Sequence, residues 1–292
     1  MTVINTNISA TLTANALSKN ERAMGQTMER LSTGLRINSA ADDAAGLAIS
    51  SKMTSQINGL NQAARNSNDA ISMLQTADGA AIEITNMLQR MRELSVQAAT
   101  GTNTSTDVAN LNTEFEALLS SIDAIANNTE WNGKKILDGS EGAGNTTSGA
   151  TAFVTTFQVG ANAGQSLQID FGDWNLAAGG TGGSGTVATG VLGVSFTGKT
   201  VSTATLAQLD GAIAGVNTRR ATYGAAINSL EHTVDNLTNV SQNTAASRSR
   251  IQDADYAAET TELARTQIIQ QAGTAMLSQA NQQAQSVLAL LK

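Results

Sequence analysis

The sequence predicts a mainly α protein, a long antiparallel coiled-coil-like helical bundle with a small β-hairpin region. Three observations predict this class. Apolar residues recur at alternating three- and four-residue spacings over long stretches, the pattern of helices that pack along one seam. None of the 292 residues is a proline, the residue that most often breaks a helix. Fifteen of the 26 glycines lie between residues 139 and 198, which sets one short segment apart from the helices.

The first long helix is expected between Ser39 and Ala99, and a second one follows Thr104. Ser39 is expected to be an N-cap because Asp42 follows three positions later, and Thr104 with Asp107 repeats this pattern. The apolar stripe of the first helix comprises Ile57, Leu60, Ala64, Ile71, Leu74, Ala77, Ala81, Ile84, Leu88, Met91 and Leu94. The seam of the second comprises Val108, Leu111, Phe115, Leu118, Ile122 and Ile125.

The strongest periodicity belongs to a third helix in the last third of the chain. Its seam positions are Leu206, Leu209, Ile213, Val216, Arg220, Tyr223, Ile227, Leu230, Val234, Leu237 and Ser241. Only Arg220 and Ser241 depart from the apolar or aromatic character of the seam, which predicts a helix of roughly 55 Å at 1.5 Å per residue. We expect three long helices of comparable length to bury their seams against one another.

The segment between the second and third helices differs in kind. Residues 157–159 and 167–171 alternate as β-strands do, with a Gly-rich turn between them. Asn132-Gly133 and Asp138-Gly139 mark turns before them. Gly179–Gly185 reads as a surface loop by composition. We therefore expect a small β region inserted between helices.

Both ends of the chain are helix-prone arms with almost no charge. The first charged residue is Lys19, and none lies between Arg265 and Lys292. One face of each arm is apolar, with Met24, Met28, Leu31 and Leu35 near the start and Ile269, Ala272, Met276, Ala280, Ala284, Val287 and Leu291 near the end. The many Gln and Asn side chains of the C-terminal arm argue against a membrane span. We expect these arms to find partners on other molecules, which points to assembly rather than catalysis.

The remaining residues predict no chemistry. A net charge of −7 gives no support for nucleic-acid binding, which needs clustered Lys and Arg. His232 is the only histidine and falls outside the helical seam, where a solvated side chain is the simpler interpretation. The pair Asp42 and Asp43 opens a helix, and Asp253 and Asp255 lack further acidic ligands for calcium. We expect no catalytic site, no metal site and no cofactor.

Several motifs resemble those of bacterial flagellins. Residues 31–46 (LSTGLRINSAADDAAG) resemble the N-terminal signature of that family, and residues 249–257 (SRIQDADYA) resemble the C-terminal one. Residues 267–274 and 279–282 extend the likeness to the chain end. The likeness covers about residues 1–172 and 203–292, in family order, and is absent from the Gly-rich insertion, where flagellins differ.

This resemblance implies a structural subunit that polymerises into the extracellular flagellar filament for motility. Residues 1–44 and 253–292 would pair as terminal helical arms, form the inner layer of the filament and order on assembly. Residues 45–175 and 203–252 would form a helical core domain with the β-hairpin region, and residues 176–202 a small surface insertion. The implied partners are other copies of the chain, an export chaperone, the type III export apparatus, and the filament cap and hook-junction proteins.

A second, local resemblance concerns residues 88–97 (LQRMRELSVQ), which are similar to the segment that Toll-like receptor 5 reads in many flagellins. It implies one receptor-facing patch made of Gln89, Arg90, Glu93, Leu94 and Glu114. The alternative interpretation is that these residues serve only packing between neighbouring subunits.

Two other classes of protein remain open on the sequence. One is the flagellin-like protein of the hook–filament junction, which shares the terminal motifs. The other is a secreted coiled-coil adhesin or toxin-like protein whose working end is the Gly-rich loop. Electron microscopy of the purified protein separates them, because long uniform filaments are expected only of a flagellin.

Overall fold

The computed structural model describes residues 7–139, 153–174, 201 and 203–289. Its contacts divide the chain into two compact units. We call residues 1–57 with 242–292 the arm unit and residues 58–241 the bundle unit. The domain limits predicted at residues 44 and 253 fall a short way inside the arm unit. The loop predicted at Gly179–Gly185 lies outside the described residues, as does nearly all of the insertion predicted at 176–202.

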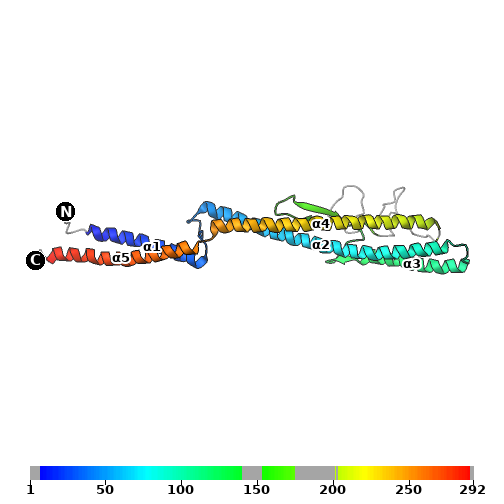
Figure 1. Ribbon diagram of the computed structural model, residues 1–292, viewed down its shortest axis with the longest axis horizontal. Coiled ribbons are helices and arrows are strands. Elements are labelled where there is room, and N and C mark those ends of the chain that lie inside the picture. The colour runs from blue at the N-terminus through cyan, green and yellow to red at the C-terminus, as the bar shows by residue number, and fades with distance from the viewer. Residues whose placement is uncertain (1–6, 140–152, 175–200, 202, 290–292) are drawn as a thin grey trace. The chain divides into compact units, whose positions relative to one another are not determined.

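The bundle unit is built from three helices that lie side by side (Figure 1). They are α2 (Ala44–Ala98), α3 (Ser105–Asn128) and α4 (Thr203–Gln252), of which α2 and α4 also extend into the arm unit. The stripe predicted on α2 is buried or half-buried, and from Leu74 to Leu94 every predicted position is at most 1% exposed. On α4, each predicted seam residue is buried or half-buried. The predicted mainly α helical bundle is confirmed.

The two polar exceptions in the α4 seam each pair with a residue of α2. Arg220 Nε lies 2.8 Å from Asp78 Oδ1, and Ser241 Oγ donates to Asn61 Oδ1 at 2.9 Å. Moving from Arg220 to Ser241 along α4 corresponds to moving backwards from Asp78 to Asn61 along α2, so the two helices are antiparallel. These exceptions therefore fix how the seam is aligned.

The expectation of three helices of comparable length is wrong, because α3 has 24 residues against 55 in α2 and 50 in α4. The predicted capping box of Thr104 and Asp107 does begin α3. The helix ends before a hairpin of β1 (Glu130–Trp131) and β2 (Lys134–Lys135). Asn132 and Gly133 join these strands with φ of 50° and 76°, the left-handed values that a two-residue turn of this type requires. The turn predicted there is confirmed.

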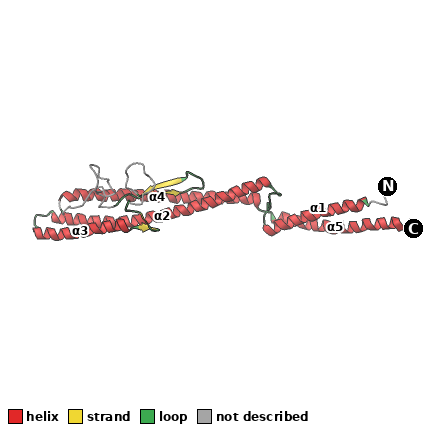
Figure 2. Cartoon of the chain, turned by 180° about the vertical axis from the view of Figure 1, so that it is seen from behind, coloured by secondary structure: helices red, strands yellow, loops and turns green. Residues whose placement is uncertain are grey.

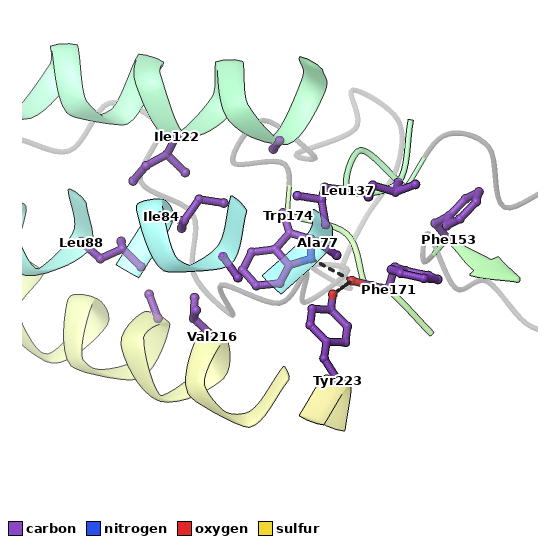
Figure 3. Packing of buried hydrophobic residues seen from close by; sticks show 14 of the residues in the cluster. Ala77, Ile84, Leu88, Ile122, Leu137, Phe153, Phe171, Trp174, Val216 and Tyr223 are labelled. Carbon is purple, nitrogen blue, oxygen red and sulfur yellow. Dashed lines mark hydrogen bonds between the residues drawn. The ribbon is translucent and has the colours of Figure 1, made fainter. Parts of the chain in front are cut away.

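A second hairpin contributes Ile169 to the bundle core. Strands β3 (Val154–Gln158) and β4 (Ser166–Asp170) pair antiparallel, close to the predicted ranges (Figure 2). The backbone carbonyl of Phe171 accepts two buried side-chain donors, Trp174 Nε1 at 2.8 Å and Tyr223 Oη at 2.6 Å (Figure 3). Burial raises the pKa of the Tyr223 phenol, which keeps it a neutral donor. The large aromatic residues thus attach the β region to α4.

In the arm unit, α1 (Ile8–Thr33) and α5 (Tyr256–Ala289) lie along each other, with the start of α1 and the end of α5 at the same end of the pair (Figure 1). Asn7 begins α1 by accepting a bond from the backbone N–H of Ala10, and Gly34 ends it with φ of 72°. Glycine adopts this left-handed value without a steric penalty. As far as the described residues go, no helix is both long and apolar enough to cross a membrane.

Candidate functional site

Two asparagine side chains bond across the contact between α1 and α5. Asn20 Nδ2 donates to the backbone oxygen of Thr266 at 2.8 Å, and Asn7 Nδ2 donates to that of Ala280 at 3.1 Å. The two acceptors are separated along α5 by almost the same number of residues as the two donors along α1. The helices are therefore antiparallel in one register, which agrees with the paired terminal helices that the resemblance implies.

The buried interior of this pair is also polar. Among the described residues of α1 and α5, the buried ones are Asn20, Thr27 and Thr266. Thr27 Oγ1 donates to the backbone oxygen of Ala23 in its own helix, so its polarity is satisfied without the partner helix. At Gly273 an added Cβ would lie 3.3 Å from Leu17 Cδ1, so the glycine lets the two helices approach closely. No large apolar side chain in the described part of α1 and α5 is fully buried, although Leu17, Met24 and Leu31 are half-buried.

Two of the motifs that carry the family resemblance pair with each other where α1 ends and α5 begins. Leu35 and Asp253 form an antiparallel bridge, and the backbone N–H of Ala254 donates to the oxygen of Gly34 at 2.9 Å. Sequence reasoning recognised both motifs but missed their pairing, since nothing in either pattern marks the other as its partner. The motif residues thus join the segment after α1 to the segment before α5.

Two side chains near the start of α5 bond to residues near the end of α1. Tyr256 Oη donates to the backbone oxygen of Leu31 at 2.7 Å. Arg30 Nη1 lies 3.2 Å from Glu259 Oε1, in a pair whose side chains are 28% and 13% exposed. These bonds align the first turns of α5 with the last turns of α1.

The structure places the predicted arm residues on two different surfaces. Met24, Leu31 and Leu35 are half-buried, whereas Met28, Ile269 and Met276 are exposed by 55%, 41% and 64%. The side chain of Val287 and the whole of Leu291 lie outside the described part of the chain. Further exposed apolar residues of the two helices are Ile8, Leu12 and Ile268. Much of the predicted apolar face of α5 therefore points away from α1.

The segment before α2 corrects the predicted N-cap. The helix begins at Ala44, and its first turn is capped by Asp43, whose Oδ1 accepts from the backbone N–H of Gly46 at 2.9 Å. Asp42 instead closes a turn, accepting from both the backbone N–H and the hydroxyl of Ser39. Hydrogen bonds lower the pKa of Asp42 to about 2. The bond from Gln26 has the largest effect, and the bonds from Ser39 have the next largest. A pattern of Ser followed by Asp three residues later fits either a helix start or this turn.

Four of the five residues of the implied receptor patch do lie together on the surface of the bundle unit. Arg90 Nε lies 2.9 Å from Glu114 Oε1, and Arg90 Nη1 lies 3.0 Å from Glu93 Oε2. The bond with Glu114, and after it the bond with Glu93, raises the pKa of Arg90, so the guanidinium stays charged. Gln89 is exposed beside them. The structure thus brings α2 and α3 together in one exposed cluster of alternating charge.

The fifth residue, Leu94, does not belong to this exposed surface. It is 1% exposed and lies in the hydrophobic core of the bundle unit. Residues four apart share a helix face only approximately, and the apolar stripe of α2 turns position 94 inwards. The expectation that Leu94 faces outwards with Arg90 is therefore wrong for the chain as described.

The acidic residues considered as metal ligands have structural roles. Asp253 accepts a bond from the Ser249 hydroxyl, and Asp255 Oδ1 accepts from the backbone N–H of Ala257 at 2.9 Å at the start of α5. Within the described ranges, no three His, Asp or Glu side chains are grouped as a metal site would need. His232 is exposed on α4.

Family profiles match both ends of the chain. Residues 4–142 match the family profile described as the bacterial flagellin N-terminal helical region, and residues 206–291 match the C-terminal helical region. Among solved structures, the crystal structure of Bacillus cereus flagellin is similar, with 32% identity, a TM-score of 0.45, and coverage of 63% of this chain and 94% of that one.

Relatives named flagellin match the chain along its whole length. The flagellin of Bacillus subtilis (strain 168) is 46% identical over 303 residues, covering 99% of both chains. The flagellin of Halalkalibacterium halodurans is 43% identical over 290 residues, covering 99% of this chain and 100% of the relative. The family is one of structural proteins, which agrees with the expectation that the chain is not an enzyme. On the strength of both terminal profiles and these full-length matches, the chain belongs to the bacterial flagellin family.

Proposed function

We propose that this protein is the structural subunit of an extracellular bacterial flagellar filament that serves motility. The observation that carries the proposal is the arrangement of α1 and α5, which bury polar residues between them and expose apolar ones. Leu12, Ile268 and Met276 are each exposed by at least 64%. Exposed apolar surface of this kind marks a site of association. Further copies of the chain are the partner that covers it.

In this proposal, residues 1–44 and 253–292 form the inner layer of the filament. The chain leaves the cell through the type III export apparatus with a dedicated chaperone. It assembles beneath the filament cap, onto the hook-junction proteins. The Gly-rich insertion at 176–202 faces the outside, because glycine-rich backbone is costly to order in a packed interface.

Truncation of the arms tests this function. Deletion of residues 1–35 or of residues 260–292 is expected to leave the bundle unit helical by circular dichroism but to abolish filaments in sedimentation and electron microscopy. Deletion of Gly179–Gly185 is the matched control, and it is expected to leave polymerisation intact. Long filaments from either truncated chain would contradict the role of the arms. Short or capped aggregates from the full chain would favour a junction protein.

The exposed cluster of Gln89, Arg90, Glu93 and Glu114 supports a second proposal, that Toll-like receptor 5 recognises the monomer. Arginine presents a rigid set of donors and is frequent at the centre of interfaces. The Arg90 side chain is 49% exposed and is held between two carboxylates, so it is oriented before a partner arrives.

A reporter assay for the receptor tests this recognition with Arg90→Ala and Arg92→Ala. Arg92 is a matched control because it lies on the same helix, is 48% exposed and pairs with Asp210 at 2.6 Å. Arg90→Ala is expected to signal at least ~tenfold less than the wild-type monomer, the loss typical of a hot-spot residue, whereas Arg92→Ala keeps most of the signal. Equal signalling by all three proteins, or none from the wild type, would confine these residues to packing.

A further inference from the structure

We propose that Met28 and Met276 are oxidation sites in the free chain, and that conversion of their thioethers to sulfoxides blocks assembly reversibly. The inference rests on the proposed filament function. Met28 and Met276 are 55% and 64% exposed, whereas Met73 and Met91 of the bundle unit are 4% and 0% exposed. The described part of the chain therefore contains both highly exposed and almost fully buried methionines, and the exposed ones lie in α1 and α5.

Accessibility decides which methionines react first. A peroxide must reach the sulfur, and its attack adds one oxygen atom to the thioether while the peroxide is reduced to water or an alcohol. Met73 and Met91 lie on α2 within the hydrophobic core of the bundle unit, so peroxide reaches them only after unfolding. Met28 and Met276 need no unfolding, and we expect both to be oxidised well before the buried pair.

The position of Met276 explains why its oxidation matters. It lies one helical turn before Ala280, whose backbone oxygen accepts the bond from Asn7. Ile8 and Leu12 follow Asn7 on α1 and are exposed by 58% and 66%. The antiparallel register thus places Met276 at the level of these two residues near the outer end of the pair. A sulfoxide there puts a polar group into apolar surface that a neighbouring copy has to cover.

Met28 lies near the other end of the pair. It lies two positions before Arg30, whose guanidinium binds Glu259. The two methionines therefore lie near opposite ends of the helix pair. Each contributes a flexible, polarisable side chain suited to an interface that forms between copies. Once a filament has formed, the same contacts shield the sulfur atoms from peroxide. Oxidation thus distinguishes free chains from assembled ones.

The experiment treats the full-length chain with hydrogen peroxide before polymerisation. Peptide mass spectrometry then follows each methionine, and sedimentation measures the polymer. We expect Met28 and Met276 to be oxidised while Met73 and Met91 stay reduced and circular dichroism is unchanged. The treated chain is expected to remain in the supernatant. Reduction by methionine sulfoxide reductases is expected to restore sedimentation.

Substitution by leucine assigns the effect to these two sites. The variant M28L/M276L keeps the apolar bulk but has nothing to oxidise there. It leaves the half-buried Met24, Met53 and Met87 in place as an internal control. After peroxide treatment the double variant is expected to sediment like the untreated chain, and the single variants show how the two sites share the effect.

Three results would overturn the inference: the buried methionines oxidise as fast as the exposed pair, the oxidised wild type still sediments, or the treated double variant fails as the wild type does. Failure of the untreated wild type to sediment would instead contradict the filament function. In that case the order of oxidation still decides whether these two methionines are the reactive sites.

Discussion

The arm pair and the bundle are both antiparallel helical assemblies, but their interiors are opposite in character. Between α1 and α5 the buried residues are Asn20, Thr27 and Thr266, and several large apolar side chains, among them Leu12, Ile268 and Met276, are exposed. In the bundle unit, α2, α3 and α4 bury Leu, Ile, Met, Phe, Tyr and Trp side chains that are almost fully shielded from water. The same helical periodicity therefore carries two different distributions of hydrophobic surface.

This difference shows where each region obtains its stability. Burial of apolar surface contributes about 25 cal/mol per Å², so the bundle can be stabilised within one chain. Hydrogen bonds contribute only about 0.5–1.5 kcal/mol each on balance, and those of the arm pair specify alignment more than strength. A pair of helices with this interior leaves its apolar surface for other molecules. The comparison gives four predictions, from the largest expected effect to the smallest.

Removal of a large core side chain is expected to affect the bundle far more than the arms. Trp174 is fully buried, and its indole N–H bonds the Phe171 carbonyl, so Trp174→Ala is expected to destabilise the chain by about 3–5 kcal/mol. Met276→Ala removes an exposed arm side chain and is expected to change stability by less than about 0.5 kcal/mol. Denaturant unfolding followed by circular dichroism measures both, and similar losses for the two variants would refute the contrast.

Two glycines of the arm unit are expected to respond in opposite directions. At Gly46 an added Cβ would lie 2.5 Å from Asp43 Oδ2 and 2.6 Å from Ile37 Cδ1, so Gly46→Ala is expected to destabilise by about 1–3 kcal/mol. Gly25 lies within α1 with no atom within 4 Å of its added Cβ, so Gly25→Ala is expected to stabilise the helix by about 0.5–1 kcal/mol. Thermal unfolding of both variants checks the signs. A neutral Gly46→Ala would mean that the turn before α2 yields easily.

An apolar residue at the centre of the arm pair is expected to make it resemble the bundle. Asn20→Leu loses the bond to the Thr266 carbonyl but gains a buried apolar side chain, for a net stabilisation of α1 and α5 of about 1 kcal/mol. Thr27→Val is the control, because Thr27 is equally buried but bonds only to Ala23 of its own helix. Hydrogen exchange of the arm amides measures the change. Weaker protection in Asn20→Leu would show that the cross-helix bond contributes more than apolar burial does.

Periodicity predicted the bundle well because the residues that alternate along a seam are the residues that the fold buries. The positions from Leu74 to Leu94 on α2 and the seam of α4 needed no knowledge of the partner helix. The length of α3 was overestimated, although its predicted seam ends at Ile125, three residues before the helix ends at Asn128. The turn predicted at Asn132-Gly133 follows soon after and leaves no place for a longer helix in the sequence.

The candidate sites were harder to predict than the fold. The local resemblance grouped Leu94 with Arg90, although the apolar stripe of α2 turns the Leu94 side chain into the core. In the arms, the stripe through Ile269 and Met276 was recognised, but a single sequence cannot show whether such a stripe contacts its own chain or another. Leu35 and Asp253 are far apart in the sequence, so neither pattern could show that the two residues pair.

The last prediction concerns pH and the turn that precedes α2. Hydrogen bonds from Gln26 and Ser39 lower the pKa of Asp42 from 3.8 to about 2 in the folded chain. Between these two values the unfolded chain binds more protons than the folded one, so stability falls as the pH drops. The contribution of Asp42 is therefore expected to be complete above about pH 4 and to disappear as the pH falls towards 2.

Two variants test this titration. Asp42→Asn cannot ionise, so its deficit in denaturant midpoint relative to the wild type is expected to be largest at pH 5 and to shrink towards pH 2. Gln26→Ala removes the bond at Asp42 Oδ1, the largest cause of the shift, and nuclear magnetic resonance is expected to show the pKa of Asp42 moving back up towards 3.8. A deficit that stays constant with pH would mean that the shape of the turn, rather than the charge of Asp42, stabilises the arm unit.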